Sequence, residues 1–452
     1  MLKPSRRDLL RGCLLGAGGL AIHSLATGLP VSFLRSGRVS HAQEADRDPT
    51  YLILALSSAG DPLNANCPGS YPNPSDASDP RWGIEHATVS ELGNGVMGEM
   101  GGMPYRAADF AEGHLCRLGN EDCWAARPWA DLPEALRARM SVIRHRTYSN
   151  AHPEFGEVIQ FHGGVSGPDN IGVESLPSFI AQAISGTLGT IIQTPFNIGG
   201  PGYNYEGAPV RQQTPDRLQQ VFAESGAWRG LEPDEFADIR DGVLDQIYQQ
   251  VQDTGTHAQK RFIDRYARSR EDARMMAEAL TVSLAPIDGA SDDVEKQIIA
   301  AGALLEHNIA PVVTLQLPFG GDNHQDNDLS TEVTETIAGV EGIRRLWQEL
   351  DSKGLQDRVT FAYLSVFGRK LKRRENGGGR DHQGDDHAMV LFGPHVQPGL
   401  IGQVSEDLHA GPIADIPAEE TLATAGKTLA RAIGVPDEII DQRIVGGRAL
   451  GG

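Results

Sequence analysis

Apolar runs of strand length alternate with helical stripes along this chain. Three runs, Tyr51–Leu56, Pro311–Leu317 and Val359–Phe367, are almost entirely apolar, which is typical of strands buried on both faces of a parallel sheet. Between the last two runs, apolar positions from Val333 to Leu350 follow one helical stripe. Strand, helix and strand in this order predict a parallel sheet with a crossover helix.

Shorter segments extend this pattern. Met140–Ile143 and Ala388–Phe392 have the length and composition of two more strands, and Thr190–Thr194 is a further possible strand. The helix Thr421–Ile433 closes the domain. Together the elements predict an α/β three-layer sandwich with a central, mostly parallel sheet and helices on both faces.

Two regions depart from the alternation. Pro68–Pro128 has little periodicity and many turn residues, so we expect a long excursion over the active-site face. Residues 206–310 instead carry amphipathic stripes in Leu218–Phe222, Phe236–Val251 and Phe262–Leu280. This second region is predicted to be a helical insertion or cap.

Composition and charge narrow the classes of function. The 452 residues are 40% apolar and 22% charged, enough to bury a large core. The formal net charge is -20, which argues against sequence-independent binding to nucleic acid or anionic lipid.

The N-terminus has the order of a twin-arginine export signal. Arg6-Arg7 precedes the weakly apolar stretch Cys13–Ile22, and Ser40-His41-Ala42 fits a small-residue cleavage site. The apolar stretch is too short to span a bilayer. We expect a signal peptide at 1–42, export by the twin-arginine translocase, a mature domain at 43–452 in the periplasm or secreted, and no transmembrane anchor after cleavage.

Three cysteines remain beyond the signal, Cys67, Cys116 and Cys123. In an oxidising compartment Cys116 and Cys123 could close a small loop, with Cys67 unpaired. The sequence leaves open whether they do.

Candidate metal ligands follow three of the predicted strands. Open α/β sheets place their ligands at the carboxyl ends of strands. Carboxylate and imidazole together suit zinc, manganese or iron better than calcium. Each residue alone is also compatible with a helix cap or a hydrogen-bonding role, but six of them suggest two ions, or one ion with an acid–base group. The candidates are Asp61, Asp322, His324, Asp381, His382 and His387.

Four motifs give the chain a family resemblance. They are Gly60-Asp61-Pro62-Leu63-Asn64, Gly321-Asp322-Asn323-His324, Phe367-Gly368-Arg369 and Gly379-Arg380-Asp381-His382. The chain resembles the exported bacterial family called domain of unknown function 1501, which looks like a branch of the alkaline phosphatase and sulfatase superfamily. The resemblance implies an alkaline-phosphatase-like sandwich holding one or two divalent ions, with zinc, manganese and calcium all left open.

The resemblance also assigns ligands by position. Asp61, Asp381 and His382 resemble the ligands of one metal. Asp322 and His324 resemble those of the other, completed by His387 or by His409.

Several positions depart from the family pattern. Pro62, Gly321, Val366 and Gln383 replace the Gly, Trp, Glu and Trp that the family commonly has. Ala151 stands where the family has the serine of a Ser-His pair, so a covalent mechanism lacks its usual nucleophile.

The reaction implied is metal-assisted hydrolysis of a small anionic phosphate or sulfate ester. Arg369 or Arg380 would clamp the anion, and His152 would act as general acid. Ser149, or else Thr147 or Cys67, is a substitute nucleophile, although a metal-bound hydroxide needs none. The alternative is a catalytically inactive, phosphatase-like metal-binding or scaffold protein of the cell envelope. The oligomeric state stays open, and a partner docking on the acidic helical region is a third hypothesis.

Overall fold

A seven-stranded sheet forms the centre of the computed structural model, which describes residues 49–161, 174–184, 194–223, 234–375, 377–411, 413 and 415–451. The strand order is β15-β6-β14-β11-β1-β10-β7. The strands span Gly399–Ile401 (β15), Met140–His145 (β6), His387–Phe392 (β14), Val359–Ser365 (β11), Tyr51–Ser57 (β1), Val312–Leu315 (β10) and Phe196–Asn197 (β7).

Strand direction gathers several loops at one edge of the sheet. β1 pairs in parallel with both β10 and β11, and β7 and β15 continue the parallel arrangement at the two sides. Within the described sheet only β14 is antiparallel to its neighbours, β11 and β6. The loops after β1, β6, β7, β10 and β11 therefore leave from the same edge, and β14 starts there.

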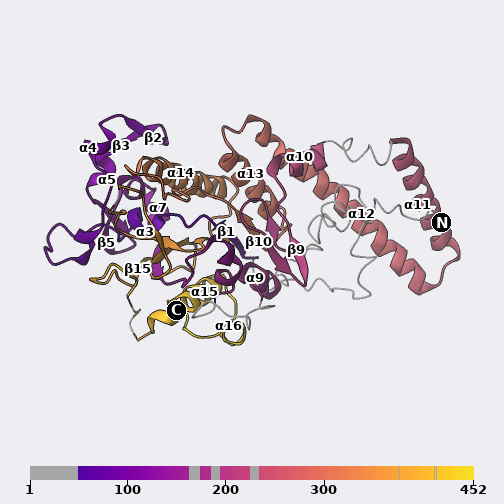
Figure 1. Ribbon diagram of the computed structural model, residues 1–452. Coiled ribbons are helices and arrows are strands. Elements are labelled where there is room, and N and C mark those ends of the chain that lie inside the picture. The colour runs from indigo at the N-terminus through magenta and orange to yellow at the C-terminus, as the bar shows by residue number, and fades with distance from the viewer. Residues whose placement is uncertain are drawn as a thin grey trace.

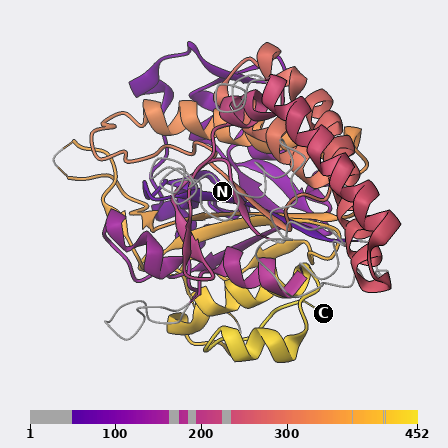
Figure 2. The same cartoon turned by 90° about the vertical axis from the view of Figure 1, so that its right-hand side faces the viewer.

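Helices cover both faces of the sheet (Figures 1 and 2). On one face lie α13 (Asp293–Glu306) and α14 (Ser330–Ser352), and on the other lie α9 (Leu176–Ile184), α15 (Thr421–Ala432) and α16 (Asp437–Arg443). Each face encloses its own apolar core. Tyr51, Ile53 and Ala55 of β1 enter the first core and the alternate residues of β1 enter the second, which is why its sequence is continuously apolar.

The predicted α/β class and mostly parallel sheet are thus confirmed. The strands expected near Met140–Ile143 and Ala388–Phe392 are β6 and β14, each somewhat longer than predicted. The crossover helix is α14 and the closing helix is α15. Of the possible strand Thr190–Thr194, only Thr194 lies among the described residues, and it is not in a strand.

The segment 68–128 is more regular than its sequence indicates. It folds into two hairpins, β2 (Val96–Met100) with β3 (Met103–Arg106) and β4 (His114–Leu118) with β5 (Glu121–Ala125). Tight turns at Gly101 and Gly119, both with positive φ, connect strands too short to show a period. Cys116 faces Cys123 across β4 and β5, and both are free thiols, as is Cys67.

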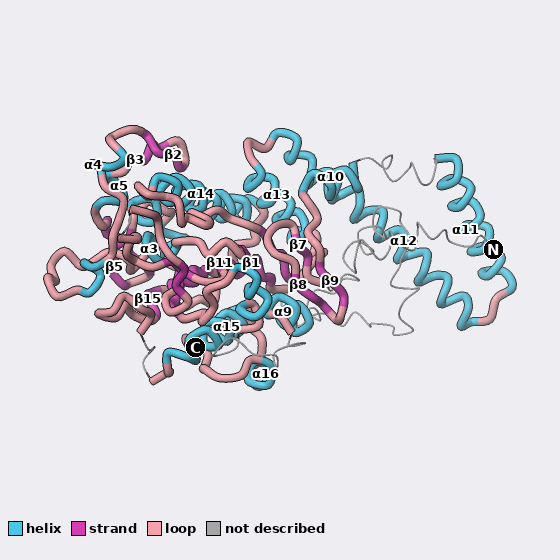
Figure 3. The backbone as a smooth tube through the Cα atoms, in the orientation of Figure 1, coloured by secondary structure: helices cyan, strands magenta, loops and turns pink. Residues whose placement is uncertain are grey.

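Among the described residues, the region between β9 and β10 is mostly helical. It contains α10 (Pro215–Ala223), α11 (Asp234–Thr254), α12 (His257–Leu284) and α13. α13 packs on α14 and β10, whereas α11 and α12 extend away from the sheet (Figures 1 and 3). No helix in the described ranges combines the length and apolarity needed to cross a membrane, and the expected signal peptide lies outside those ranges.

The remaining elements are short. The helices are α3 (Leu63–Asn66), η1 (Pro80–Gly83), α4 (Val89–Leu92), α5 (Ala108–Ala111), α6 (Arg127–Ala130), α7 (Glu134–Arg137), η2 (His152–Glu154), α8 (Phe155–Val158), η5 (Ala285–Gly289) and η6 (Ala418–Glu420). The strands are β8 (Tyr203–Tyr205), β9 (Ala208–Val210), β12 (Gly368–Arg369) and β13 (His382–Gln383).

Candidate metal centre

Three loops at the carboxyl edge of the sheet each contribute one side chain to a common point. His152 begins η2 after β6, Asp322 lies in the loop after β10, and His382 lies in β13, beyond β11. One ligand atom from each residue lies within 4.8 Å of the other two. We call these three residues the open triad.

The spacing of the open triad suits a transition-metal ion. His152 Nε2 is 3.6 Å from an oxygen of Asp322. Ligands about 2.1 Å from a tetrahedral zinc ion lie about 3.4 Å from one another. Three protein ligands would leave a fourth position for water or substrate, as catalytic zinc sites do.

Hydrogen bonds to backbone carbonyls fix the tautomers of two imidazoles. His152 Nδ1 lies 2.8 Å from Ser58 O, and His382 Nδ1 lies 2.6 Å from Asn150 O. A carbonyl can only accept, so each Nδ1 carries a hydrogen and each Nε2 presents a lone pair. Metal-binding histidines are usually held in this way.

His324 lies beside the open triad in the opposite tautomer. Its Nδ1 accepts a hydrogen bond from Arg374 Nη2 at 2.8 Å, which places the proton of the neutral ring on Nε2. That Nε2 lies 2.7 Å from His382 Nε2 and 3.5 Å from an oxygen of Asp322. Burial, reinforced by the charge of Arg369, lowers the pKa of His324. Hence His324 is arranged to donate a hydrogen bond rather than to bind an ion.

Arg369 lies beneath the open triad with its side chain fully buried. Its Nη2 donates to Asp322 Oδ1 at 2.9 Å and to Ala59 O at 2.7 Å, and its Nε donates to Gly60 O. Burial raises the pKa of Asp322, but the hydrogen bond and charge of Arg369 outweigh it and leave that pKa below its ordinary value. Asp322 is therefore held ionised and in place.

Asp61, a predicted ligand, lies behind the loop rather than in the open triad. It is 2% exposed, and the hydroxyl of Tyr363 donates to its carboxylate. Burial raises the pKa of Asp61, while hydrogen bonds from Ser57, Tyr363 and the Gly321 backbone oppose that rise. Gly321 directly precedes Asp322, so its contact with Asp61 helps to hold Asp322 in position.

His387, another predicted ligand, faces the opposite strand. It pairs in register with His145, and its Nδ1 lies 3.2 Å from His145 Nε2. Burial lowers the pKa of His145 to about 4 and holds that of His387 well below its ordinary value. Both rings are neutral groups of the sheet interior.

Asp381 is a further predicted ligand that lies outside the open triad. Its carboxylate bonds Arg374 Nε at 2.5 Å and lies 3.6 Å from Lys370 Nζ. Its nearest approach to His324 is to Nδ1, at 3.8 Å, on the edge of the ring away from His382. His409, the alternative to His387, instead hydrogen-bonds Gln383.

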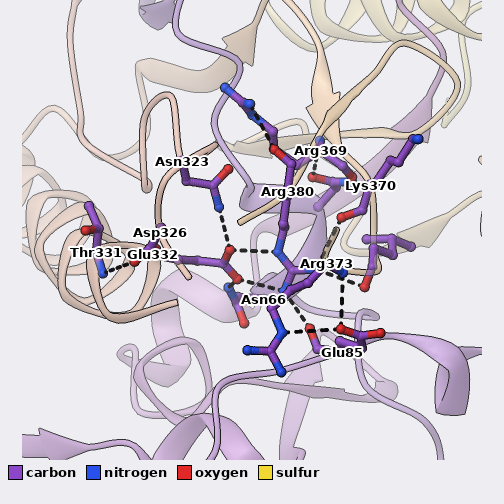
Figure 4. A network of polar contacts seen from close by, with 12 residues as sticks. Asn66, Glu85, Asn323, Asp326, Thr331, Glu332, Arg369, Lys370, Arg373 and Arg380 are labelled. Carbon is purple, nitrogen blue, oxygen red and sulfur yellow. Dashed lines mark hydrogen bonds and ion pairs between the residues drawn. The ribbon is translucent and has the colours of Figure 1, made fainter. Parts of the chain in front are cut away.

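Arg380, expected to clamp an anion, is buried and fully occupied (Figure 4). Its Nε and Nη2 grip the two oxygens of Glu332 at 2.7 and 3.0 Å. Its other N–H groups reach the backbone oxygens of Lys370, Leu371 and Glu85. Glu332 also receives the amide of Asn323 at 2.9 Å, so this Arg380–Glu332 network fixes the residue between Asp322 and His324.

Of the candidate nucleophiles, Ser149 and Cys67 have hydrogen-bonding partners for the side-chain atom itself. Ser149 Oγ both donates to Ala151 O and accepts from Ala151 N, forming a local turn. Cys67 lies buried beside Ser70 Oγ, and burial raises the pKa of its thiol. Thr147 is buried, and its backbone N–H donates to Gly384 O, while its hydroxyl has no hydrogen-bond partner within the described part of the chain. None of these contacts directs a nucleophile toward the open triad.

Other contributors to the site have no distinctive sequence signal. Arg374 sits in a basic turn whose sequence is typical of a solvated loop, yet it sets the tautomer of His324. Ser58 and Asn150 act only through their carbonyl oxygens. The ring of Phe367 stacks on His382 with centroids 4.1 Å apart; its place in the Phe-Gly-Arg motif was the one available clue.

A comparison with known protein families identifies a domain within this α/β chain. Residues 203–414 match the family model described as "Protein of unknown function (DUF1501)". The chain therefore carries a DUF1501 family domain, which includes Asp322, His324 and His382. A search of curated proteins found no match.

Proposed function

We propose that the chain is an exported, metal-dependent hydrolase of phosphate or sulfate esters, related to the alkaline phosphatase and sulfatase superfamily. The observation that carries the proposal is the open triad at the carboxyl edge of the sheet. One ligand atom from each of its three residues lies within 4.8 Å of the other two. His152 and His382 present lone pairs and Asp322 presents a carboxylate, the donor set that zinc and manganese prefer. The twin-arginine sequence Arg6-Arg7 supports export.

A bound ion would lower the pKa of a water molecule and polarise the ester oxygen. The chain's own residues position the ion's ligands and attract the substrate. Arg369 holds Asp322 in its coordinating position. Arg374 and Lys370, whose side chains are 36% and 55% exposed, supply the positive charge that draws an anionic ester toward the triad.

His324, rather than His152, is placed to hydrogen-bond the departing oxygen. The Nε2–H of His324 points into the site, where it donates to His382 Nε2 at 2.7 Å. If His382 Nε2 binds an ion instead, this N–H would be left to hydrogen-bond the departing oxygen. His152 is needed as a ligand, since its Nε2 lone pair faces Asp322.

Metal content and turnover test the proposal together. We expect the purified protein to contain zinc or manganese by plasma mass spectrometry, and to hydrolyse 4-nitrophenyl phosphate or sulfate when loaded. His382→Ala should lose both properties, while His257→Ala, an exposed histidine at the start of α12, should keep both. Absence of any bound metal would refute the site; bound metal without turnover on either ester would favour the inactive scaffold.

A further inference from the structure

A cavity of about 790 Å³ opens on the β7 side of the sheet. α8 and the residues after it form one wall, and the segment that contains the β8–β9 hairpin forms another. The lining includes Gly156, Gln160, Gly200, Asn204 and Gln212. None of these residues belongs to the candidate metal centre.

Two segments of the chain connect the cavity wall with residues of the open triad. η2, which starts with His152, runs directly into α8, where Gly156 lines the cavity. Gly200 lies against the carboxyl ends of β1 and β10: a Cβ placed there would be 3.0 Å from Leu56 O and 3.4 Å from Leu315 O. β1 is followed by Ser58, whose carbonyl oxygen hydrogen-bonds His152, and β10 is followed by the loop that contains Asp322. The cavity therefore lies at the same edge of the sheet as the open triad.

The lining combines apolar side chains, such as Ile159, Tyr203 and Val210, with uncharged polar ones, and no charge dominates it. Amide and hydroxyl side chains come from Gln160, Ser175, Asn204 and Gln212. The charged lining residues have both signs: Glu206 and Arg211 are exposed, and Glu174 is paired with Arg443. Opposite charges at the rim give no net attraction for an ion, whereas amides suit neutral groups that both donate and accept hydrogen bonds.

Three buried side-chain oxygens of the lining have no hydrogen-bond partner within the described part of the chain: Gln160 Oε1, Tyr203 Oη and Glu174 Oε2, the last of which contacts Arg443. An enclosed acceptor such as the side-chain oxygen of Gln160 costs free energy unless a donor reaches it. A hydroxyl-rich ligand in the cavity would supply that donor.

We propose that this cavity binds the alcohol portion of the ester, and that this portion is neutral and rich in hydroxyl groups, as a sugar is. The inference rests on the proposed function for the position of the ester, but the binding of the alcohol portion is a property of the cavity itself.

The test compares two phosphate esters of similar size. Glucose 6-phosphate carries a hydroxylated ring, and cyclohexylmethyl phosphate carries an apolar ring of the same size. We expect kcat/KM to be at least about tenfold higher for glucose 6-phosphate, as one or two well-placed hydrogen bonds allow. Equal rates, or a preference for the cyclohexyl ester, would overturn the proposal.

Filling the cavity provides the matched variant. A Cβ at Gly156 meets no atom within 4 Å, so Gly156→Phe places a ring in the cavity without a backbone clash. It should abolish the preference for glucose 6-phosphate. Gly242→Phe, at an equally open glycine of α11, should keep it; a preference that survives Gly156→Phe would contradict the cavity assignment.

A binding measurement separates this inference from the proposed reaction. If neither ester is hydrolysed, methyl glucoside is tested by saturation-transfer difference NMR. Signal that Gly156→Phe removes and Gly242→Phe retains would sustain the cavity while the hydrolase proposal fails. No signal with the wild-type protein would overturn the cavity proposal.

Discussion

The open triad and the Arg380–Glu332 network lie in neighbouring loops and are built from similar residue types, yet they differ in what is left unpaired. All five N–H groups of Arg380 have acceptors, and both oxygens of Glu332 have donors. In the open triad, Nδ1 of His152 and of His382 is held by a backbone carbonyl, while Nε2 of His152 faces Asp322 and Nε2 of His382 faces the N–H of His324. The Arg380–Glu332 network is fully paired and acts as a frame, whereas the Nε2 atoms of the site contact only other residues of the site.

The largest expected effect comes from disrupting the Arg380–Glu332 network. Arg380→Met should destabilise the fold by about 3–5 kcal/mol, because it leaves the carboxylate of Glu332 buried without its partner. Urea unfolding followed by circular dichroism measures the change. The double variant Arg380→Met with Glu332→Gln should cost clearly less than the sum of the two single variants; additive costs would show that the pair does not act as a unit.

A second prediction concerns the enclosed histidines, which contrast with those of the triad. The folded-state pKa of His145, about 4, lies below its unfolded value near 6.5. The unfolded chain therefore binds a proton that the folded chain rejects, and stability should fall by about 3 kcal/mol as the pH drops from 6.5 to about 4. Urea midpoints across this range measure the loss. His145→Gln should flatten the curve, and an unchanged slope would rule out His145 as its source.

The third prediction addresses the open triad itself. His382→Ala should weaken zinc binding by about 100-fold, since roughly 10–16 kcal/mol is shared among the ligands of a structural zinc site. Competition with a chromophoric chelator measures the affinity. Circular dichroism should stay unchanged because the ring is only partly buried.

The smallest expected effect distinguishes the open triad from its neighbour in sequence. Asp381→Ala should change zinc affinity less than about threefold and stability by less than about 1 kcal/mol, because its pairs with Arg374 and Lys370 are partly exposed. The same chelator assay applies. If Asp381→Ala lost as much metal as His382→Ala, Asp381 would be a ligand. The ligand set inferred from the histidine tautomers would then be wrong.

Much of the fold was predictable from local patterns. β1 and β11 are continuous apolar runs because both faces of each strand are covered. α14 shows its stripe because one side packs on the sheet. The hairpins of 68–128 were missed because four- and five-residue strands joined by tight turns leave no period to detect.

The site was predictable only in part. The sequence indicated Asp322, His324, His382 and His152 as functional residues, because strand ends collect ligand groups. It also indicated Asp61, His387 and Arg380, which have the same chemistry but are buried and paired in the fold. Residue type and position after a strand do not reveal which partner a side chain finds.

By itself the sequence determined the α/β sheet, the order of its principal elements and the edge at which polar side chains collect, since hydrophobic periodicity and strand direction are local or nearly local properties. Only the tertiary structure decided which polar groups are hydrogen-bonded within the Arg380–Glu332 network and which face the open triad. That division depends on contacts between loops far apart in the chain, such as Ser58 with His152, Asn150 with His382 and Arg374 with His324. Each of these contacts fixes a proton on one ring nitrogen, and so determines whether the ring can bind an ion or donate a hydrogen bond.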